Sequence, residues 1–145
     1  MNSDWSYKGK PFELPEEHDW YGFVYLITTV DTGMKYVGKK FLFQKKTRQV
    51  KGKKKRYLAE SDWKEYFGSN DVLKEEVAEK GVDNYKREII HLCKTKAECA
   101  YMETKEIFDR GAILNPEYYN GWISCKITRR HLAKHSERIL DLHYR

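Results

Sequence analysis

Alternating apolar and polar positions predict a β-hairpin near the start of the chain. Residues 21–29 are rich in aromatic and β-branched side chains, which is typical of a strand. Asp31-Thr32-Gly33 has turn chemistry, because glycine tolerates a positive φ. Residues 34–37 are apolar or aromatic at alternate positions and predict the partner strand, with Gly38 at its end. Residues 1–20 show no periodicity and predict an extended lead-in.

A helix and a third strand are predicted in the middle of the chain. Ser69 or Asp71 is suited to cap a helix that runs to Lys80, and Gly81 supplies its stop. The apolar side chains expected on the buried side of this helix are Val72, Leu73 and Val77. Residues 85–92 have the composition of a strand.

Two further helices are predicted in the last third. Thr95-Lys96-Ala97-Glu98 is a capping box and indicates a helix that runs to about Arg110. The side chains expected on its core-facing side are Ala97, Ala100, Tyr101, Thr104, Ile107 and Phe108. From about residue 128 the chain predicts a C-terminal helix whose polar side is basic, with Arg129, Arg130, Lys134 and Arg138.

This order of elements predicts an α+β domain, built as a small three-stranded antiparallel sheet flanked by helices. We expect an N-terminal extension over residues 1–20 and a main domain over residues 21–123. A basic insert over residues 39–60 follows the second strand, and a basic C-terminal helix occupies residues 124–145.

Positive charge is clustered in one stretch of the chain. The 145 residues include 28 Lys and Arg against 22 Asp and Glu, which alone is a modest excess. Between residues 39 and 56, however, every charged residue is basic: Lys39, Lys40, Lys45, Lys46, Arg48, Lys51, Lys53, Lys54, Lys55 and Arg56. Such a run repels itself and favours a polyanion, since phosphates that it neutralises release their counterions. The alternative is a solvated, flexible loop.

Composition also indicates a compartment. No apolar run is long enough to span a membrane, and the first residues lack the charged and apolar pattern of a secretory signal. Cys93, Cys99 and Cys125 show no paired spacing, which argues against a disulfide framework. We therefore expect no membrane partner and a reducing cytoplasm, that of the host cell if the gene is phage-encoded.

Short motifs then follow one another in a particular order. These motifs are Phe23-Val24-Tyr25, Lys35-Tyr36-Val37-Gly38, Tyr66-Phe67-Gly68-Ser69, residues 84–90, Glu103 and Tyr119-Asn120. The succession resembles the GIY-YIG nuclease superfamily, and its middle is similar to phage-type homing endonucleases. The resemblance runs from about residue 22 to residue 123. Phe23 is a departure, because the family has glycine there.

The resemblance implies a metal-dependent DNA endonuclease that hydrolyses phosphodiester bonds. Glu103 would hold Mg²⁺ or Mn²⁺, because a lone carboxylate with water and phosphate oxygens suits magnesium. Tyr25 and Tyr36 are the implied catalytic tyrosines, and one of them would position or deprotonate the attacking water. A phenol has an ordinary pKa near 10, so we expect a cationic neighbour, Lys39 or Lys40. Asn120 would support the site, and Gly38 would be structural.

The basic residue that contacts the reacting phosphate has two candidates. The family places a catalytic arginine about ten residues beyond the second motif, and Arg48 lies near that place within the lysine-rich stretch. Lys40 is the alternative. The remaining expected contacts are to the DNA backbone, from Lys39, Lys45, Lys46, Lys51, Lys53, Lys54, Lys55, Arg56, Arg129 and Arg130.

Other functions remain open from the sequence. A non-catalytic nucleic-acid-binding protein that retained the nuclease fold would bind but not cut. A module whose basic loop binds an acidic protein would show no preference for DNA over another polyanion. Within the enzyme class, a branch-cutting repair nuclease is a further hypothesis. A homodimer is a separate hypothesis about the oligomeric state.

Overall fold

Five strands form the central sheet of this mixed α+β fold, in the order β2-β1-β7-β3-β4. The computed structural model describes residues 4–144. The strands of this sheet are β1 (Trp5–Tyr7), β2 (Lys10–Pro11), β3 (Gly22–Thr29), β4 (Lys35–Phe41) and β7 (Tyr85–Cys93). The α+β class is thus confirmed, whereas the predicted number of strands is wrong. Residues 1–3 of the expected extension and Arg145 of the expected C-terminal helix lie outside the described residues.

The extra strands come from the segment expected to be an extended lead-in. β1 pairs in parallel with β7, and Trp5 lies opposite Arg87 in that pairing. The side chain of Trp5 is buried, and its indole N–H donates to the carbonyl of Trp63 at 2.7 Å. Tyr7 and Phe12 of this segment also pack against the core, but two strands of three and two residues are too short for these side chains to set a clear period.

The predicted β3–β4 hairpin is present, with Tyr25 opposite Gly38. Its second strand continues to Phe41, so Gly38 lies inside β4 and does not end it. β4 is also the outermost strand of the sheet, which leaves one of its edges free of a strand partner.

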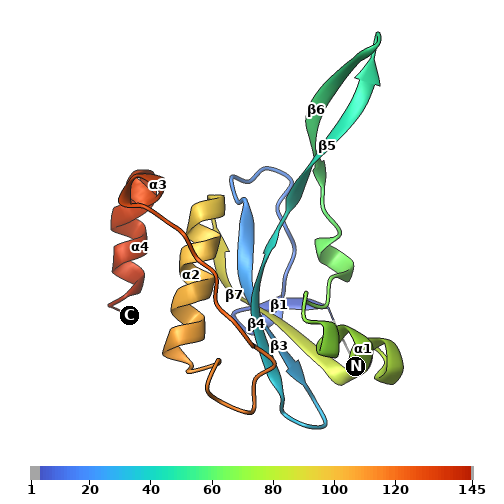
Figure 1. Cartoon of the computed structure of the whole chain (residues 1–145), viewed down its shortest axis with the longest axis vertical. Helices are drawn as coiled ribbons and strands as arrows, with labels where there is room; N and C mark the ends of the chain where they lie inside the picture. Colours follow the sequence, from blue (N-terminus) through green and yellow to red (C-terminus); the bar gives the residue numbers. More distant parts are fainter. Residues whose placement is uncertain (1–3, 145) are drawn as a thin grey trace.

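The sheet separates two apolar cores. On one face, alternate residues of β3 pack with Trp5, Trp63 and Leu73, the last from α1 (Asp71–Lys80). On the other face, Val24 and Val37 pack against α2 (Lys96–Asp109). Figure 1 shows α2 lying along this face of the sheet, with the C-terminal helices beside it.

Three details of the helices differ from the prediction. Asn70, rather than Ser69 or Asp71, caps α1 by accepting from the backbone N–H of Leu73. Val72 is exposed, so only Leu73 and the half-buried Val77 of the expected stripe face the core. In α2, Phe108 is also exposed, and the buried apolar side chains are Cys99, Met102 and Ile107.

The basic stretch folds into a second, two-stranded antiparallel sheet. Its strands are β5 (Phe43–Val50) and β6 (Lys53–Glu60), and Figure 1 shows this hairpin standing away from the body of the molecule. The basic insert was predicted without regular structure, as a loop, whereas most of it is paired in these two strands. A 3-10 turn (η1, Trp63–Glu65) then returns the chain to α1, and another (η2, Val82–Asn84) precedes β7.

The C-terminal helix is broken rather than continuous. It consists of α3 (Arg129–Leu132), a 3-10 turn (η3, Ala133–His135) and α4 (Ser136–Leu142). Ile139 packs against the α2 side of the sheet, and Arg138 is paired with the fully buried carboxylate of Glu98. Over residues 4–144, none of the helices has the length and apolarity needed to cross a bilayer.

Candidate active site

A cleft with a volume of about 510 Å³ opens beside the outermost strand, β4. β4, α2, the segment before α1 and the chain that follows α2 all contribute to its walls. The residues of chemical interest on these walls are Tyr36, Lys39, Lys40, Tyr66, Glu103 and Asn120. Residues from distant parts of the sequence thus meet around one strand edge.

Two of the residues predicted for the site do not line this cleft. Tyr25 is fully buried beneath it, in the core on the α1 side of the sheet. Arg48 lies on β5, in the projecting hairpin, with its guanidinium 5.4 Å from the ring centre of Tyr57. The structure therefore does not bring Arg48 to the other predicted residues, whereas it does bring Lys40 to them.

Glu103 is the acidic side chain of the cleft. Its carboxylate is 3.1 Å from the ammonium of Lys39, and the two side chains are 16% and 33% exposed. Among residues 4–144 no group of three or more His, Cys, Asp or Glu side chains converges on a metal position. A divalent cation at Glu103 would thus take its remaining ligands from water and substrate oxygens, which suits Mg²⁺. Lys39 would have to move aside, and its partial exposure leaves room for that.

Asn120 clamps the free edge of β4. Its side-chain oxygen accepts from the backbone N–H of Val37 at 3.0 Å, and its amide donates to the carbonyl of the same residue at 2.8 Å. Asn120 is 8% exposed, so both hydrogen bonds are shielded from water. The clamp satisfies the backbone groups of Val37 at an edge that no strand of residues 4–144 covers, and it fixes the backbone between Tyr36 and Gly38.

The segment that carries Asn120 is itself tied to β4. The N–H of Tyr119 donates to the carbonyl of Lys35 at 2.7 Å, and the N–H of Lys35 donates to the carbonyl of Glu117 at 2.9 Å. The side-chain amide of Asn70 donates to the carbonyl of Tyr119 at 3.1 Å. Burial and the neighbouring Glu76 raise the pKa of Tyr119 to about 12. The predicted Tyr-Asn pair therefore acts as an anchored unit.

The two tyrosines of the motifs have different environments. Burial raises the pKa of Tyr25 well above its ordinary value, and the neighbouring Tyr66 and Tyr36 add to this effect. Burial also raises the pKa of Tyr36, whose hydroxyl lies 3.0 Å from the hydroxyl of Ser69 on the cleft wall. Both phenols are therefore protonated at neutral pH.

Among residues 4–144, Lys39 and Lys40 pair with groups other than the hydroxyls of Tyr25 and Tyr36. The ammonium of Lys40 is 2.6 Å from a carboxylate oxygen of Asp62 and 4.1 Å from the ring centre of Tyr66. Lys39 is paired with Glu103. The expectation that Lys39 or Lys40 would lower a tyrosine pKa is thus wrong for the geometry seen here.

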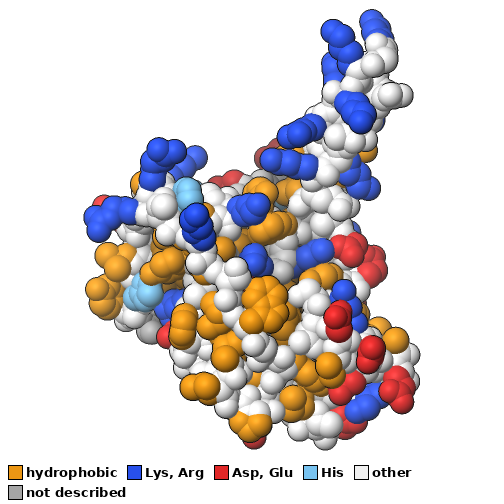
Figure 2. Space-filling model, in the orientation of Figure 1, with side chains coloured by type: hydrophobic (Ala, Val, Ile, Leu, Met, Phe, Trp, Pro, Cys, Tyr) orange, Lys and Arg blue, Asp and Glu red, His pale blue; other side chains and the backbone are white. Residues whose placement is uncertain are grey.

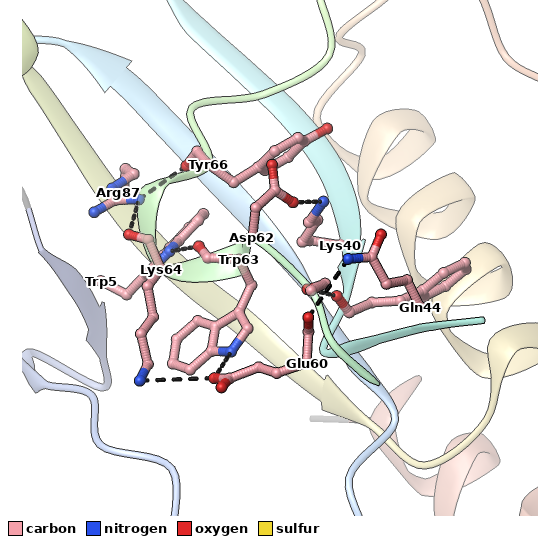
Figure 3. Close-up of polar contacts among 11 residues, drawn as sticks. Trp5, Lys40, Gln44, Glu60, Asp62, Trp63, Lys64, Tyr66 and Arg87 are labelled. Carbon is pink, nitrogen blue, oxygen red and sulfur yellow. Dashed lines mark hydrogen bonds and ion pairs between the residues drawn. The ribbon is translucent and has the colours of Figure 1, made fainter. Parts of the chain in front are cut away.

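Buried Arg87 positions the segment that carries Tyr66. As Figure 3 shows, its guanidinium donates to the carbonyls of Lys64 and Tyr66, at 2.9 and 2.8 Å. It also lies between the rings of Trp5 and Phe67, 4.7 and 4.1 Å from their centres. Burial lowers the pKa of Arg87 to about 10, which leaves it charged at neutral pH.

Sequence reasoning missed several residues of the cleft. Tyr66 and Ser69 belong to a motif that supports the family resemblance but had no predicted role, and Asn70 follows this motif directly. Trp122 follows the Tyr-Asn pair and is 75% exposed at the cleft wall, which is unusual for an indole. The position of these residues within or next to a motif was the available signal.

Basic side chains surround the cleft on two sides. In Figure 2 they gather along the projecting hairpin and over the α3 end of the molecule. Those predicted to contact DNA in the two regions are all exposed: Lys45, Lys46, Lys51, Lys53, Lys54, Lys55, Arg56, Arg129 and Arg130. The foot of β5 and residues 121–124, which lead toward α3, both line the cleft.

Comparison with known families agrees with this geometry. The family described as "Putative endonuclease segE, GIY-YIG domain" matches residues 5–123, from β1 to just beyond Asn120. No curated protein and no solved structure gave a significant match. Because the match covers well over half of the chain, the protein belongs to the SegE-type family of GIY-YIG endonuclease domains.

Proposed function

We propose that this protein is a metal-dependent endonuclease that hydrolyses phosphodiester bonds in DNA, and that the cleft beside β4 is its active site. The observation that carries the proposal is the meeting of Tyr36, Lys40 and Glu103 in one cleft, with Asn120 fixing the strand between them. These groups provide a hydroxyl that can orient water, a cation that can neutralise a phosphate and a carboxylate that can hold a metal ion, and together they suit phosphodiester hydrolysis. Family membership supports the nuclease activity.

Glu103 is the proposed ligand of Mg²⁺ or Mn²⁺. When bound, the cation would neutralise charge on the phosphate and on the leaving oxygen. The carboxylate faces the cleft from α2, and among residues 4–144 its ion-pair partner is Lys39. Lys39, once displaced, remains near enough to neutralise a phosphate oxygen.

Tyr36 is the proposed water-positioning residue. Its hydroxyl lies on the cleft wall beside Ser69, whereas Tyr25 is buried below. Because burial raises its pKa, Tyr36 acts as a neutral hydroxyl that orients the attacking water by hydrogen bonding. Tyr25 supports the strand that carries Gly38 and Tyr36.

Lys40 is the proposed contact to the reacting phosphate. It lines the cleft, and its ammonium is held by Asp62 and by the face of Tyr66. Arg48, the other candidate, is better placed to contact DNA away from the cut. The exposed lysines and arginines of the hairpin and of α3 would grip the backbone on either side of the cleft.

We extend the proposal to a homing role and to a homodimer. The similarity of the middle of the chain to phage-type homing endonucleases is the sole support for a homing role. A homodimer is one way to cut both strands of a duplex, since one cleft holds one set of these residues.

A non-catalytic DNA-binding protein with the nuclease fold is the second candidate. The Lys39–Glu103 ion pair favours it, because an ammonium 3.1 Å from the carboxylate competes with a metal ion. Cleavage of supercoiled plasmid separates the two candidates. The protein should nick or linearise plasmid with Mg²⁺ or Mn²⁺, but neither with EDTA nor as the Glu103→Ala variant. Tight binding without cutting under any of these conditions would support the non-catalytic candidate.

A further inference from the structure

We propose that the β5–β6 hairpin enters the major groove of duplex DNA as a two-stranded ribbon and supplies the sequence preference of the protein. The inference rests on the proposed function, because it takes DNA as the substrate. It adds the element that selects the sequence, a role that the cleft residues do not have.

The dimensions of the hairpin suit a groove. Its strands pair without interruption from Phe43 opposite Glu60 to Val50 opposite Lys53. At roughly 3.3 Å per residue the ribbon is about 25 Å long. It forms a sheet of its own and projects from the body, as Figure 1 shows, so both of its faces are open. The major groove of B-DNA admits a two-stranded ribbon, whereas its minor groove, only about 6 Å wide, accepts strands when the duplex is bent or the groove is widened.

Both faces of the hairpin are positively charged and therefore favour contact with a polyanion. One face carries Lys45, Lys54 and Arg56, and the other carries Lys46, Arg48, Lys53 and Lys55. No carboxylate lies between Gln44 and Ala59. Arg48 and Lys55 are direct cross-strand partners, and like charges opposite each other destabilise a sheet. Contact with phosphates would relieve this repulsion.

The two faces differ in their neutral side chains. Thr47 lies opposite Arg56, and Gln49 lies opposite Lys54, so one face combines hydrogen-bond donors and acceptors with cations. Arginine and lysine pair with guanine edges, glutamine with adenine, and threonine with several bases. We assign this face to the bases. The other face is mostly cationic, and its long side chains would reach the phosphates that flank the groove.

The foot of the hairpin fixes its position relative to the cleft. Phe43 and Gln44 at the start of β5, and Ser61 just after β6, line the cleft. The hydroxyl of Ser61 donates to the carbonyl of Phe41 at 2.6 Å, and its N–H donates to the carbonyl of Leu42 at 2.9 Å. A duplex that held the ribbon in its groove would therefore present its backbone to the cleft.

Binding selection from a random-sequence duplex library tests the assignment of the faces, with the full chain and without added metal. We expect the wild type to select a sequence. In the Thr47→Val/Gln49→Ala variant, the ratio of affinities for the preferred and the other bases should fall about tenfold at one or more positions. The slope of log Kd against log salt should stay unchanged, since no charge is removed. The Lys46→Gln/Lys53→Gln/Lys55→Gln variant should keep the preference but bind more weakly, with a flatter slope.

A charge-matched control lies outside the hairpin. Lys8, Lys10 and Lys74 are exposed and do not line the cleft. Their joint replacement by glutamine should affect the salt slope less than the hairpin triple variant does. Absence of sequence preference in the wild type, or full retention of it in the Thr47→Val/Gln49→Ala variant, would overturn the inference.

Base analogues test which groove is used. In the selected sequence, 7-deazaguanine removes a major-groove acceptor, and inosine removes a minor-groove amino group. We expect 7-deazaguanine to weaken binding about tenfold at a contacted guanine and inosine to leave it nearly unchanged. The reverse ranking would overturn the inference. Selective binding without any metal-dependent cleavage would instead refute the nuclease proposal while leaving the ribbon assignment standing.

Discussion

The hydroxyl of Tyr25 lies directly under Gly38, 2.3 Å from the point where a β-carbon at that position would stand. The two residues are cross-strand partners in β3 and β4. Tyr25 is fully buried, and its ring packs against those of Trp5, Phe23 and Tyr66. The second motif therefore needs glycine at position 38, because the side chain of Tyr25 occupies the space that a β-carbon would fill.

Replacement of Gly38 by alanine should disturb both stability and cleavage. The new methyl group would collide with the Tyr25 ring, and such overpacking costs roughly 1–3 kcal/mol. Because β4 carries Tyr36 and Lys40, cleavage should fall as well. Gly121→Ala is the control for stability, since a β-carbon there meets nothing within 4 Å. Equal melting temperatures for the two variants would contradict this account of Gly38.

The two motif tyrosines should respond differently to loss of the hydroxyl. Tyr36→Phe removes the group on the cleft wall and should slow cleavage by about a hundredfold or more. Tyr25→Phe removes a buried hydroxyl that does not reach the cleft and should slow it less than about tenfold. Single-turnover rates, with thermal melts to confirm folding, measure the difference. A larger effect at Tyr25 would show that Tyr25 reaches the substrate.

The Asn120 clamp predicts sensitivity to a one-atom change. Asn120→Asp keeps the acceptor for the N–H of Val37 but loses the donor to its carbonyl, and it places a carboxylate against that carbonyl. We expect a loss of roughly 1–3 kcal/mol in the free energy of unfolding, together with loss of cleavage. Asn115→Asp is matched to it, because half-buried Asn115 accepts with its side-chain oxygen from the N–H of Glu117, and an aspartate keeps that acceptor. Similar unfolding curves for the two variants would refute the clamp.

Glu106 on α2 predicts a pH dependence of stability. His91, and after it the Coulombic effect of Arg110, hold the pKa of this carboxyl below its ordinary value, against the opposing effect of burial. Because the pKa of Glu106 is lower in the folded state than in the unfolded state, its ionised form stabilises the fold at pH values above the unfolded-state pKa, near 4.3. That stabilisation is lost as the pH falls through the folded-state pKa. The wild type should therefore exceed Glu106→Gln in stability at pH 7, and the difference should shrink toward pH 3. Urea unfolding across this range measures it, and a difference independent of pH would contradict the assignment.

Periodic segments were predictable from the sequence, whereas segments without a buried face were not. The hairpin of β3 and β4, the helix α1 and the strand β7 each bury alternate or helically spaced apolar residues, and all were expected. β1 is too short to show a period and depends on Trp5, which packs only once the sheet exists. The β5–β6 hairpin has no apolar face, since nearly all its side chains are exposed, so its strands left no hydrophobic signal.

The candidate site followed the same division. Tyr36, Glu103 and Asn120 could be found because the motifs occur in order along the chain, and the fold brings these residues to one cleft. The contribution of Tyr66 depends on a carbonyl contact of buried Arg87, a tertiary contact that sequence spacing does not express. The choice between Lys40 and Arg48 likewise needed the hairpin, which carries Arg48 away from the cleft.

The most direct test of the account is the single-turnover rate of DNA cleavage as a function of Mg²⁺ concentration, for the wild type and for Glu103→Gln. The substitution keeps the size of the side chain and removes the charge that would hold the metal. We expect the wild-type rate to rise with Mg²⁺ and saturate, while the variant binds DNA as well but cuts at least about a hundredfold more slowly. A variant that cuts at the wild-type rate, with the same dependence on Mg²⁺, would contradict the assignment of Glu103 and of the cleft beside β4.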